Sequence, residues 1–123
     1  VSKSKDGRTL ITLWKTKTNT PRTLPLTERA REALEWSREE GHQRPFSGID
    51  YKSFKDHVCA VAHDLGFKDV VVYTFRHTCA SRLVQRGADI MRVKQWMGHS
   101  NIETTLGYAK LAPEDIYTLS DLL

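Results

Sequence analysis

Glycines divide most of this chain into segments too short to form a long helix. They stand at positions 41, 66, 87 and 98, each directly after a stretch whose apolar residues recur at helical spacing. Glycine commonly follows the last residue of a helix, because it adopts the left-handed backbone conformation there without a steric penalty. The chain is therefore expected to fold as short helices joined by tight turns. No run approaches the ~18 consecutive apolar residues of a membrane-spanning helix.

Two helices are predicted in the middle of the chain. The first is capped by Thr27, runs to about Glu40 and stops at Gly41. The second is capped by Asp50 and ends at Gly66. The small or apolar face of the first consists of Ala30, Ala33, Leu34 and Ser37, and the second carries an apolar stripe expected to face the core: Phe54, Val58, Val61, Ala62 and Leu65.

Three shorter helices are predicted after a buried extended segment at 70–72. The first begins near Thr74, the second is capped by Asp89, and each ends at the next glycine. The third begins at Ser100, which has the spacing of a capping box with Glu103. Their apolar contacts recur at intervals of about one turn: Leu83, Ile90, Val93, Met97 and Ile102.

The N-terminal part is expected to form strands. Residues 9–14 alternate and include β-branched types, and residues 22–26 can return as a second strand, with Pro25 restricting it to an edge. An amphipathic tail helix is predicted at 111–123. The chain is thus predicted to be one α+β domain, residues 1–123, that is mostly α: an N-terminal β-hairpin (a small antiparallel sheet) packed on a bundle of about five short helices plus the tail helix.

The charge is unevenly distributed along the chain. The 123 residues contain 19 Lys and Arg against 15 Asp and Glu, a net charge of +4. Residues 1–31 hold eight basic and two acidic residues, a net charge of +6, whereas residues 111–123 carry −3. A basic N-terminal part suits a polyanionic partner, although charged residues can also simply keep a hairpin soluble.

The N-terminal sequence indicates the compartment, and the spacing of the cysteines and histidines argues against a metal site. The N-terminus lacks the apolar centre of a signal peptide, so a cytoplasmic protein is expected, with no membrane association. Cys59 and Cys79 lack paired spacing and are predicted to be reduced core thiols. His57, Cys59 and His63 do not share a helix face, so no metal site is expected.

Four polar residues in the second half fall at predicted helix starts or loop edges: Arg76, His77, His99 and Tyr108. Side chains at such places are held firmly yet reach solvent. Taken singly, each has an ordinary explanation. A tyrosine such as Tyr108 usually packs, and His99 could bond a backbone carbonyl. Arg76, expected in the first turn of its helix, opposes the helix dipole unless an anion binds there as well.

Taken together, these residues form a pattern. The run from 73 to 111 (YTFRHTCASRLVQRGADIMRVKQWMGHSNIETTLGYAKL) resembles the C-terminal signature of the tyrosine recombinases, the phage integrase family. The segment TKTNTPRTLPL likewise resembles the family's β-turn lysine segment, with its lysine at Lys17. The ordered matches are Arg76, His77, Gly98, His99, Ser100, Thr104, Thr105 and Tyr108.

The resemblance implies site-specific DNA recombination of the phage or prophage integration type, with no metal or other cofactor. Tyr108 would be the nucleophile, because a tyrosine phosphodiester conserves the energy of the broken DNA bond in a 3′-phosphotyrosyl intermediate. Arg76 would clamp the scissile phosphate, His99 would donate a hydrogen bond to it, and Lys17 would protonate the departing 5′-oxygen. His77, Gly98 and Ser100 would support the site structurally. The implied partners are double-stranded DNA and further copies of the protein on DNA, contacted through the tail.

Two departures from the family pattern limit this expectation. Tyr73 stands where the family usually has the first His of its His-x-x-Arg box, and its role is left open. The family's other essential arginine lies upstream of the lysine segment, and Arg8 lacks the helical context for that role. The chain is therefore expected to be the C-terminal part of a catalytic domain, without the upstream arginine helix and the N-terminal DNA-binding domains, and inactive or nearly so by itself.

Two other interpretations stay open. Helices at 74–86, 89–97 and 101–110 joined by short turns are superficially similar to a helix-turn-helix DNA-binding module. Against this, residues 101–110 offer only Asn101 and Lys110 for reading bases. The third interpretation is an inert prophage remnant that merely folds.

Overall fold

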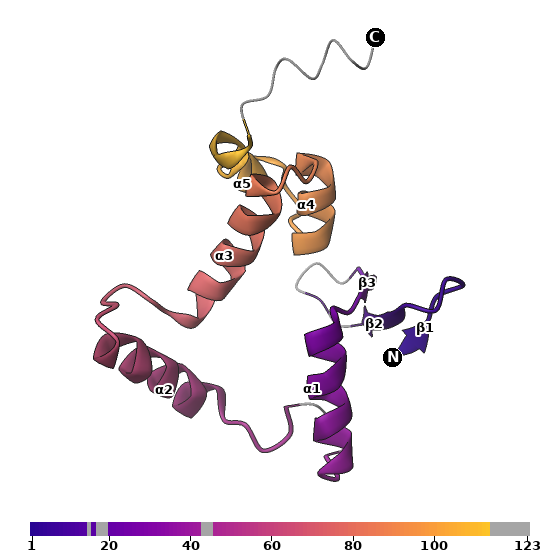
Figure 1. Ribbon diagram of the computed structural model, residues 1–123, viewed down its shortest axis with the longest axis vertical. Helices are drawn as coiled ribbons and strands as arrows, with labels where there is room; N and C mark the ends of the chain where they lie inside the picture. Colours follow the sequence, from indigo (N-terminus) through magenta and orange to yellow (C-terminus); the bar gives the residue numbers. More distant parts are fainter. Residues whose placement is uncertain (15, 17–19, 43–45, 114–123) are drawn as a thin grey trace. The chain divides into compact units, whose positions relative to one another are not determined.

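The computed structural model describes residues 1–14, 16, 20–42 and 46–113. The chain divides into two compact units, Val1–Tyr51 and Lys52–Leu123. The first unit holds a small sheet and one helix, and the second holds the remaining helices (Figure 1). Strands followed by mostly helical structure confirm the predicted α+β class.

The N-terminal sheet has three antiparallel strands in the order β1-β2-β3. Strands β2 (Thr9–Leu13) and β3 (Arg22–Pro25) form the predicted hairpin. The hydroxyls of Thr12 and Thr23, which face each other in this pair, lie 3.0 Å apart. Pro25 ends the edge strand β3, where its missing N–H costs no ladder hydrogen bond. Strand β1 (Ser2–Lys3) was not predicted, because two exposed polar residues carry no alternation signal.

Helix α1 (Glu28–Glu39) follows the sheet with the predicted cap and stop. The Thr27 hydroxyl accepts a hydrogen bond from the Ala30 N–H at 3.3 Å, and Gly41 follows the helix at φ +80°. Ser37 is the buried residue of its inner face. Ala33, which was predicted on that face, is exposed instead.

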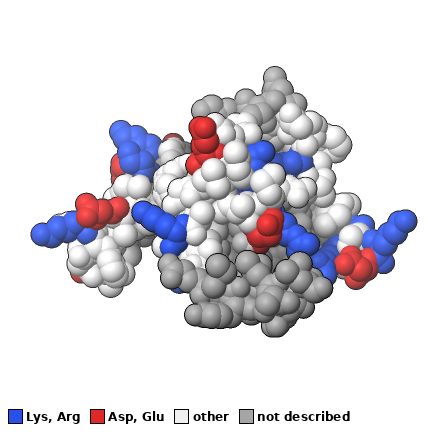
Figure 2. Space-filling view, turned by 90° about the horizontal axis from the view of Figure 1, so that it is seen from above, with Lys and Arg blue, Asp and Glu red and all other residues white. Residues whose placement is uncertain are grey.

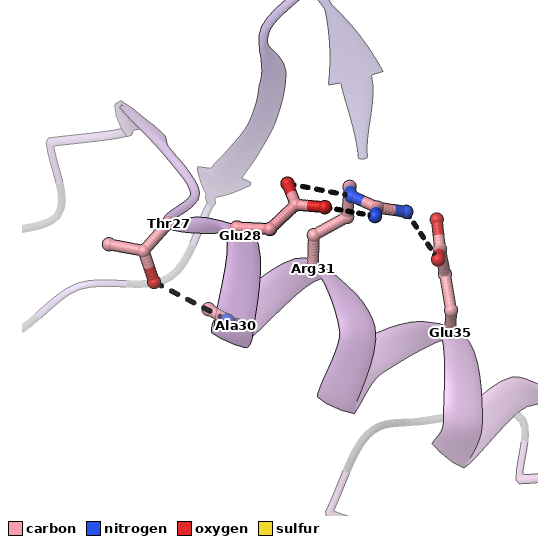
Figure 3. A network of polar contacts seen from close by, with 5 residues as sticks. All are labelled: Thr27, Glu28, Ala30, Arg31 and Glu35. Carbon is pink, nitrogen blue, oxygen red and sulfur yellow. Dashed lines mark hydrogen bonds and ion pairs between the residues drawn. The ribbon is translucent and has the colours of Figure 1, made fainter.

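Ion pairs within the first unit neutralise part of its positive charge. The Arg31 guanidinium donates to Glu28 and, at 2.5 Å, to Glu35 on the next turn of α1 (Figure 3). Arg31 lowers the pKa of the Glu28 carboxyl through these hydrogen bonds and its charge. Arg8 pairs with Asp6 at 3.0 Å. On the face shown in Figure 2, basic and acidic side chains likewise lie beside one another.

In the second unit, α3 (Val72–Gln85) packs on α4 (Ile90–Met97). Of the short elements that follow, α5 (Glu103–Leu106) contacts α4, and the 3-10 turn η1 (Ala109–Leu111) contacts α3 and α5. The predicted contacts Val93 and Met97 are confirmed as buried. The core cluster consists of Ala80, Val84, Val93 and Met97, surrounded by Leu83, Ala88, Ile90, Trp96, Tyr108 and Leu111.

Helix α2 (Tyr51–Asp64) differs from its expected role. Its apolar stripe was predicted to face the core, yet of these residues only Ala62 is buried, and 69% of Leu65 is exposed. The chain turns at Gly66, and α3 then leads away from α2 (Figure 1). The stripe consequently borders an open apolar groove of about 430 Å³, which Phe67 and Phe75 also line. In the part of the chain that the structure describes, no helix is long and apolar enough to cross a bilayer.

Helix α3 begins two residues earlier than predicted. The expected buried extended segment at 70–72 is only partly present: Val71 is extended but 46% exposed, and Val72 is already helical. The reason is a local hydrogen bond: the Thr74 hydroxyl accepts from the Val71 N–H at 3.0 Å, which places Thr74 inside the first turn rather than at the cap. Arg76 therefore lies in the second turn of α3, not in the first.

The segment after α4 also differs from its prediction. No capping box forms between Ser100 and Glu103; the side-chain Oδ1 of Asn101 accepts from the Glu103 N–H at 3.0 Å instead. The continuous helix expected at 101–110 is broken into α5 and η1. Both cysteines are free, as predicted, but Cys79 is exposed and is not a core thiol.

Asp89 gives a test of how α4 is held. One oxygen of its carboxylate accepts hydrogen bonds from the N–H groups of Met91 and Arg92, at 2.9 and 3.1 Å. We expect Asp89→Ala to lower the free energy of unfolding by about 1 kcal/mol, a typical value for the loss of a helix cap. Urea unfolding followed by circular dichroism measures this change. Asp89→Asn keeps the accepting oxygen and should stay close to the parent chain; an equal loss in both variants would contradict the capping role.

Candidate active site

Three of the candidate residues lie on α3. Tyr73 and His77 are four residues apart and so share one face of the helix. Their rings meet edge to face, with centroids 4.7 Å apart and an interplanar angle of 80°. Arg76 precedes His77 and points to a different neighbour, described next. Helix α3 thus presents the pair of Tyr73 and His77 on one face, and the cation of Arg76 from the residue next to His77.

Arg76 ties α3 to the end of α4. Its guanidinium donates a hydrogen bond to the Met97 carbonyl at 2.5 Å. Met97 is the last residue of α4, where the unpaired carbonyls give the helix end a partial negative charge. The cation therefore compensates the C-terminal end of α4. The expected conflict with the dipole of its own helix is weaker than predicted, because Arg76 lies in the second turn of α3.

His99 is positioned by the joint between α4 and α5. Gly98 has a φ of +68°, and this left-handed turn reverses the chain directly after α4. Nδ1 of His99 then lies 2.9 Å from the hydroxyl of Thr105, which is fully buried. Because both partners are held by the fold, the orientation of the imidazole ring is fixed. Ser100, which follows it, is exposed.

Tyr108 lies at the break between α5 and η1. It is the residue directly before η1, and its backbone N–H donates to the Thr105 carbonyl at 3.0 Å. Its hydroxyl oxygen lies 2.5 Å from Nδ1 of His77 on α3. The ring is half-buried and packs against the core cluster. The interruption of the helix therefore leaves Tyr108 directed toward α3.

The surroundings of Tyr108 favour its protonated form. Burial raises the pKa of its phenol, Tyr73 raises this pKa further, and the positive charge of Arg76 acts in the opposite direction. A phenol already has a pKa of ~10, so little phenolate exists at neutral pH. For Tyr108 to act as a nucleophile, a neighbouring group must accept its proton.

The structure brings together part of the predicted site. His77 contacts Tyr73 and Tyr108, and Arg76 lies close enough to affect the ionisation of Tyr108. Lys17 is outside the described residues. Sequence reasoning gave His77 only a supporting role; its spacing of four residues from Tyr73 was the one signal that both face the same way. No group of three metal-ligating side chains occurs among the described residues.

Comparisons of the sequence with known proteins identify the family of the chain. The sequence model described as "Phage integrase family" matches residues 2–115. The chain belongs to the phage integrase family. The family match includes every candidate site residue, from Lys17 to Tyr108.

Individual relatives agree with the family match. The integrase of Escherichia phage P2 is 33% identical over 104 residues, which are 85% of this chain and 30% of that protein. The integrase of Haemophilus phage HP1 (strain HP1c1) is 33% identical over 106 residues, 86% of the chain and 30% of that protein. Tyrosine recombinase XerD of Lacticaseibacillus casei is 35% identical over 68 residues, 55% of the chain and 22% of that protein. The chain thus spans less than a third of the length of these relatives.

The raised pKa of Tyr108 predicts how stability depends on pH. Folding favours the protonated phenol, so its contribution to stability is complete below the unfolded pKa of ~10 and is lost as pH rises through the folded value. We expect the phenol to ionise above pH ~10, and stability to fall more steeply with alkaline pH in the parent chain than in Tyr108→Phe.

Absorbance at 295 nm follows this ionisation, as the difference between the parent chain and Tyr108→Phe, and chemical unfolding at several alkaline pH values follows stability. Tyr51→Phe, which removes an exposed phenol, is the matched control for the loss of one of four tyrosines. Ionisation of Tyr108 below pH ~10 would contradict the prediction.

Proposed function

We propose that this chain acts as part of a tyrosine recombinase catalytic domain that cleaves and rejoins DNA in site-specific recombination of the phage or prophage integration type. The observation that carries this proposal is the placement of the Tyr108 hydroxyl against His77 and near Arg76, in a chain whose residues 2–115 match the phage integrase family. A nucleophile, a proton acceptor and a phosphate-binding cation are the groups that metal-free phosphoryl transfer to tyrosine requires.

In the proposed reaction Tyr108 attacks the scissile phosphate and forms a 3′-phosphotyrosyl bond, which frees a 5′-hydroxyl. That hydroxyl then attacks the phosphotyrosyl bond of a partner strand, so strands are exchanged without an external energy source. The DNA bond energy is kept in the covalent intermediate.

Arg76 and His99 stabilise the charge of the reacting phosphate in this proposal. A guanidinium has five N–H donors in a planar fork, so Arg76 can bond the Met97 carbonyl and still offer donors to a non-bridging oxygen. The bond to Thr105 holds the His99 ring, and Nε2 is the atom that we assign to the phosphate. Side chains held by the fold in this way need little reorganisation as charge develops.

The remaining partners are also proposals. Lys17 would protonate the departing 5′-oxygen, and Gly98 and Ser100 would shape the joint that carries His99. Double-stranded DNA at attachment or recombination sites is the substrate, and the protein would act on it in the cytoplasm of a bacterial or phage-infected cell. Self-association through residues 113–123 stays a prediction, since most of that segment lies outside the described residues.

The chain alone is expected to be inactive or nearly so. Its matched residues make up only 30% of the phage P2 integrase. Of the other interpretations, a helix-turn-helix module is disfavoured by α5, whose four residues are too few for a recognition helix. An inert prophage remnant is one outcome of the experiment below.

Covalent capture tests the nucleophile. The chain, preceded by the corresponding upstream residues of the phage P2 integrase, is incubated with a pool of nicked duplexes of randomised sequence. We expect a protein–DNA adduct that survives denaturation, because the nick lets the cleaved fragment diffuse away before rejoining. Tyr108→Phe should abolish the adduct, since it removes the attacking oxygen.

Tyr51→Phe is the matched control and should leave the adduct unchanged. Sequencing the captured DNA identifies the preferred site. Sequence-specific binding without any adduct would favour a binding module, and neither binding nor adduct would favour the inert remnant.

Lys17 is tested with the same capture assay and a modified substrate. We expect Lys17→Ala to slow adduct formation by about 10²-fold, as for loss of a general acid. A 5′-bridging sulfur leaves without protonation, so it should restore the rate of the variant. Lys5→Ala is the matched control. Absence of rescue would reassign Lys17 to phosphate binding.

A further inference from the structure

We propose that His77 is the general base for Tyr108, accepting the phenol proton on Nδ1 as the tyrosine attacks phosphate. The sequence left the role of Tyr73 open, and we place the base at His77, one helical turn further along α3. This inference rests on the proposed function and deepens it, because it names the group that activates the nucleophile.

The first argument is geometric. A general base must lie within hydrogen-bond reach of the proton that it removes, about 2.6–3.2 Å between heavy atoms or closer. The distance from Nδ1 of His77 to the Tyr108 hydroxyl oxygen is 2.5 Å. The two residues are 31 positions apart, and the packing of η1 on α3 brings them together. His77 is exposed enough to exchange a proton with solvent afterwards.

The second argument is the residue at position 73. A neutral tyrosine hydroxyl is a poor proton acceptor, so Tyr73 cannot replace a histidine as the base near neutral pH. Its ring instead packs edge to face on His77, with centroids 4.7 Å apart. Tyr73 thus packs against the imidazole, and Tyr108 contacts its Nδ1. Tyr73 therefore supports the imidazole of His77 and is not itself the base.

The third argument is that the phenol of Tyr108 stays protonated and therefore needs a base to remove its proton. Burial and Tyr73 raise the pKa of Tyr108, so the phenol stays protonated until the proton is taken from it. Imidazole is the side chain that changes its charge between about pH 5 and 8 and can therefore accept that proton near neutrality. Among the described residues, the ionisable groups that act on Tyr108 are Tyr73 and Arg76, both from α3. The charge of Arg76 favours the phenolate that develops during attack.

The step balances without a further reactant. The bond from Tyr108 Oη to phosphorus forms, the bond from phosphorus to the 5′-oxygen breaks, and the phenol proton moves to Nδ1 of His77. The 5′-oxygen takes its proton from the general acid, which we assign to Lys17. In rejoining, His77 returns its proton to the departing phenolate, and the acid becomes the base.

The nucleophilicity of Tyr108 can be measured on the chain itself, without DNA. N-acetylimidazole transfers its acetyl group to a tyrosine oxygen, with loss of the phenol proton, and mass spectrometry of peptides gives the rate at each tyrosine. We expect Tyr108 to react faster than the more exposed Tyr51 near neutral pH. The logarithm of its rate should rise with pH over the range in which an imidazole loses its proton.

Two substitutions separate proton transfer from positioning. Asparagine places an accepting oxygen where His77 has Nδ1, so His77→Asn can still hold Tyr108 but cannot take its proton, whereas His77→Ala does neither. We expect both variants to slow acetylation of Tyr108 by about 10²-fold. They should also abolish the rise of this rate with pH that we attribute to the imidazole. His63→Asn, at an exposed histidine of α2, is the matched control. A rate for His77→Asn within about twofold of the parent would overturn the proposal.

A measurement on the parent chain guards against variants that fail to fold. Nitrogen-15 spectra of labelled histidine distinguish the two neutral tautomers of the ring. We expect neutral His77 to carry its proton on Nε2, and its Nδ1 resonance to shift in Tyr108→Phe. A proton on Nδ1 in the neutral ring would make His77 the donor and refute its role as base.

The covalent capture assay then separates this inference from the function on which it rests. If adducts form and His77→Asn lowers the rate of their formation by about 10²-fold, the proposed function and the role of His77 both stand. If adducts form at the parent rate in His77→Asn, the proposed function stands and the role of His77 fails. If the parent forms no adduct, the proposed function fails, while acetylation still decides whether His77 activates Tyr108.

Discussion

The hydrogen bond from Arg76 to the Met97 carbonyl joins the core of the second unit to its candidate chemistry. Met97 is 4% exposed and belongs to the core cluster, so the guanidinium is anchored to a part of the fold that packing holds firmly. The same bond compensates the negative end of α4. A cation positioned in this way stays at the site whether or not a phosphate is present, which limits the reorganisation that binding requires.

Several features set by local chemistry were predictable from the sequence, whereas features set by distant contacts were harder to predict. The caps at Thr27 and Asp89 and the left-handed turn at Gly98 each depend on a few neighbouring atoms, and all three occur as expected. The break between α5 and η1 contradicts the helical pattern of 101–110, because Tyr108 packs against the core and bonds α3 instead of continuing a helix. Tertiary packing outweighs helix propensity at this point.

The same distinction applies to the site. The resemblance identified the candidate residues and their order, and the family match includes them. It could not supply the contact between His77 and Tyr108, since no periodicity relates positions 31 residues apart. The early start of α3 was missed although its cause is local: a single hydroxyl, that of Thr74, moved the helix boundary and with it the turn in which Arg76 lies.

The consecutive positions of Arg76 and His77 give α3 a double role. Neighbouring residues on an α-helix project about 100° apart, so one can reach the end of α4 while the next reaches the start of η1. Both contacts are observed. A rotation of α3 about its axis would therefore disturb both contacts, and with them the phosphate clamp and the proton acceptor that we propose. The packing of Ala80 and Val84, one and two turns further along α3, opposes that rotation, so a small apolar core sets the geometry of both groups.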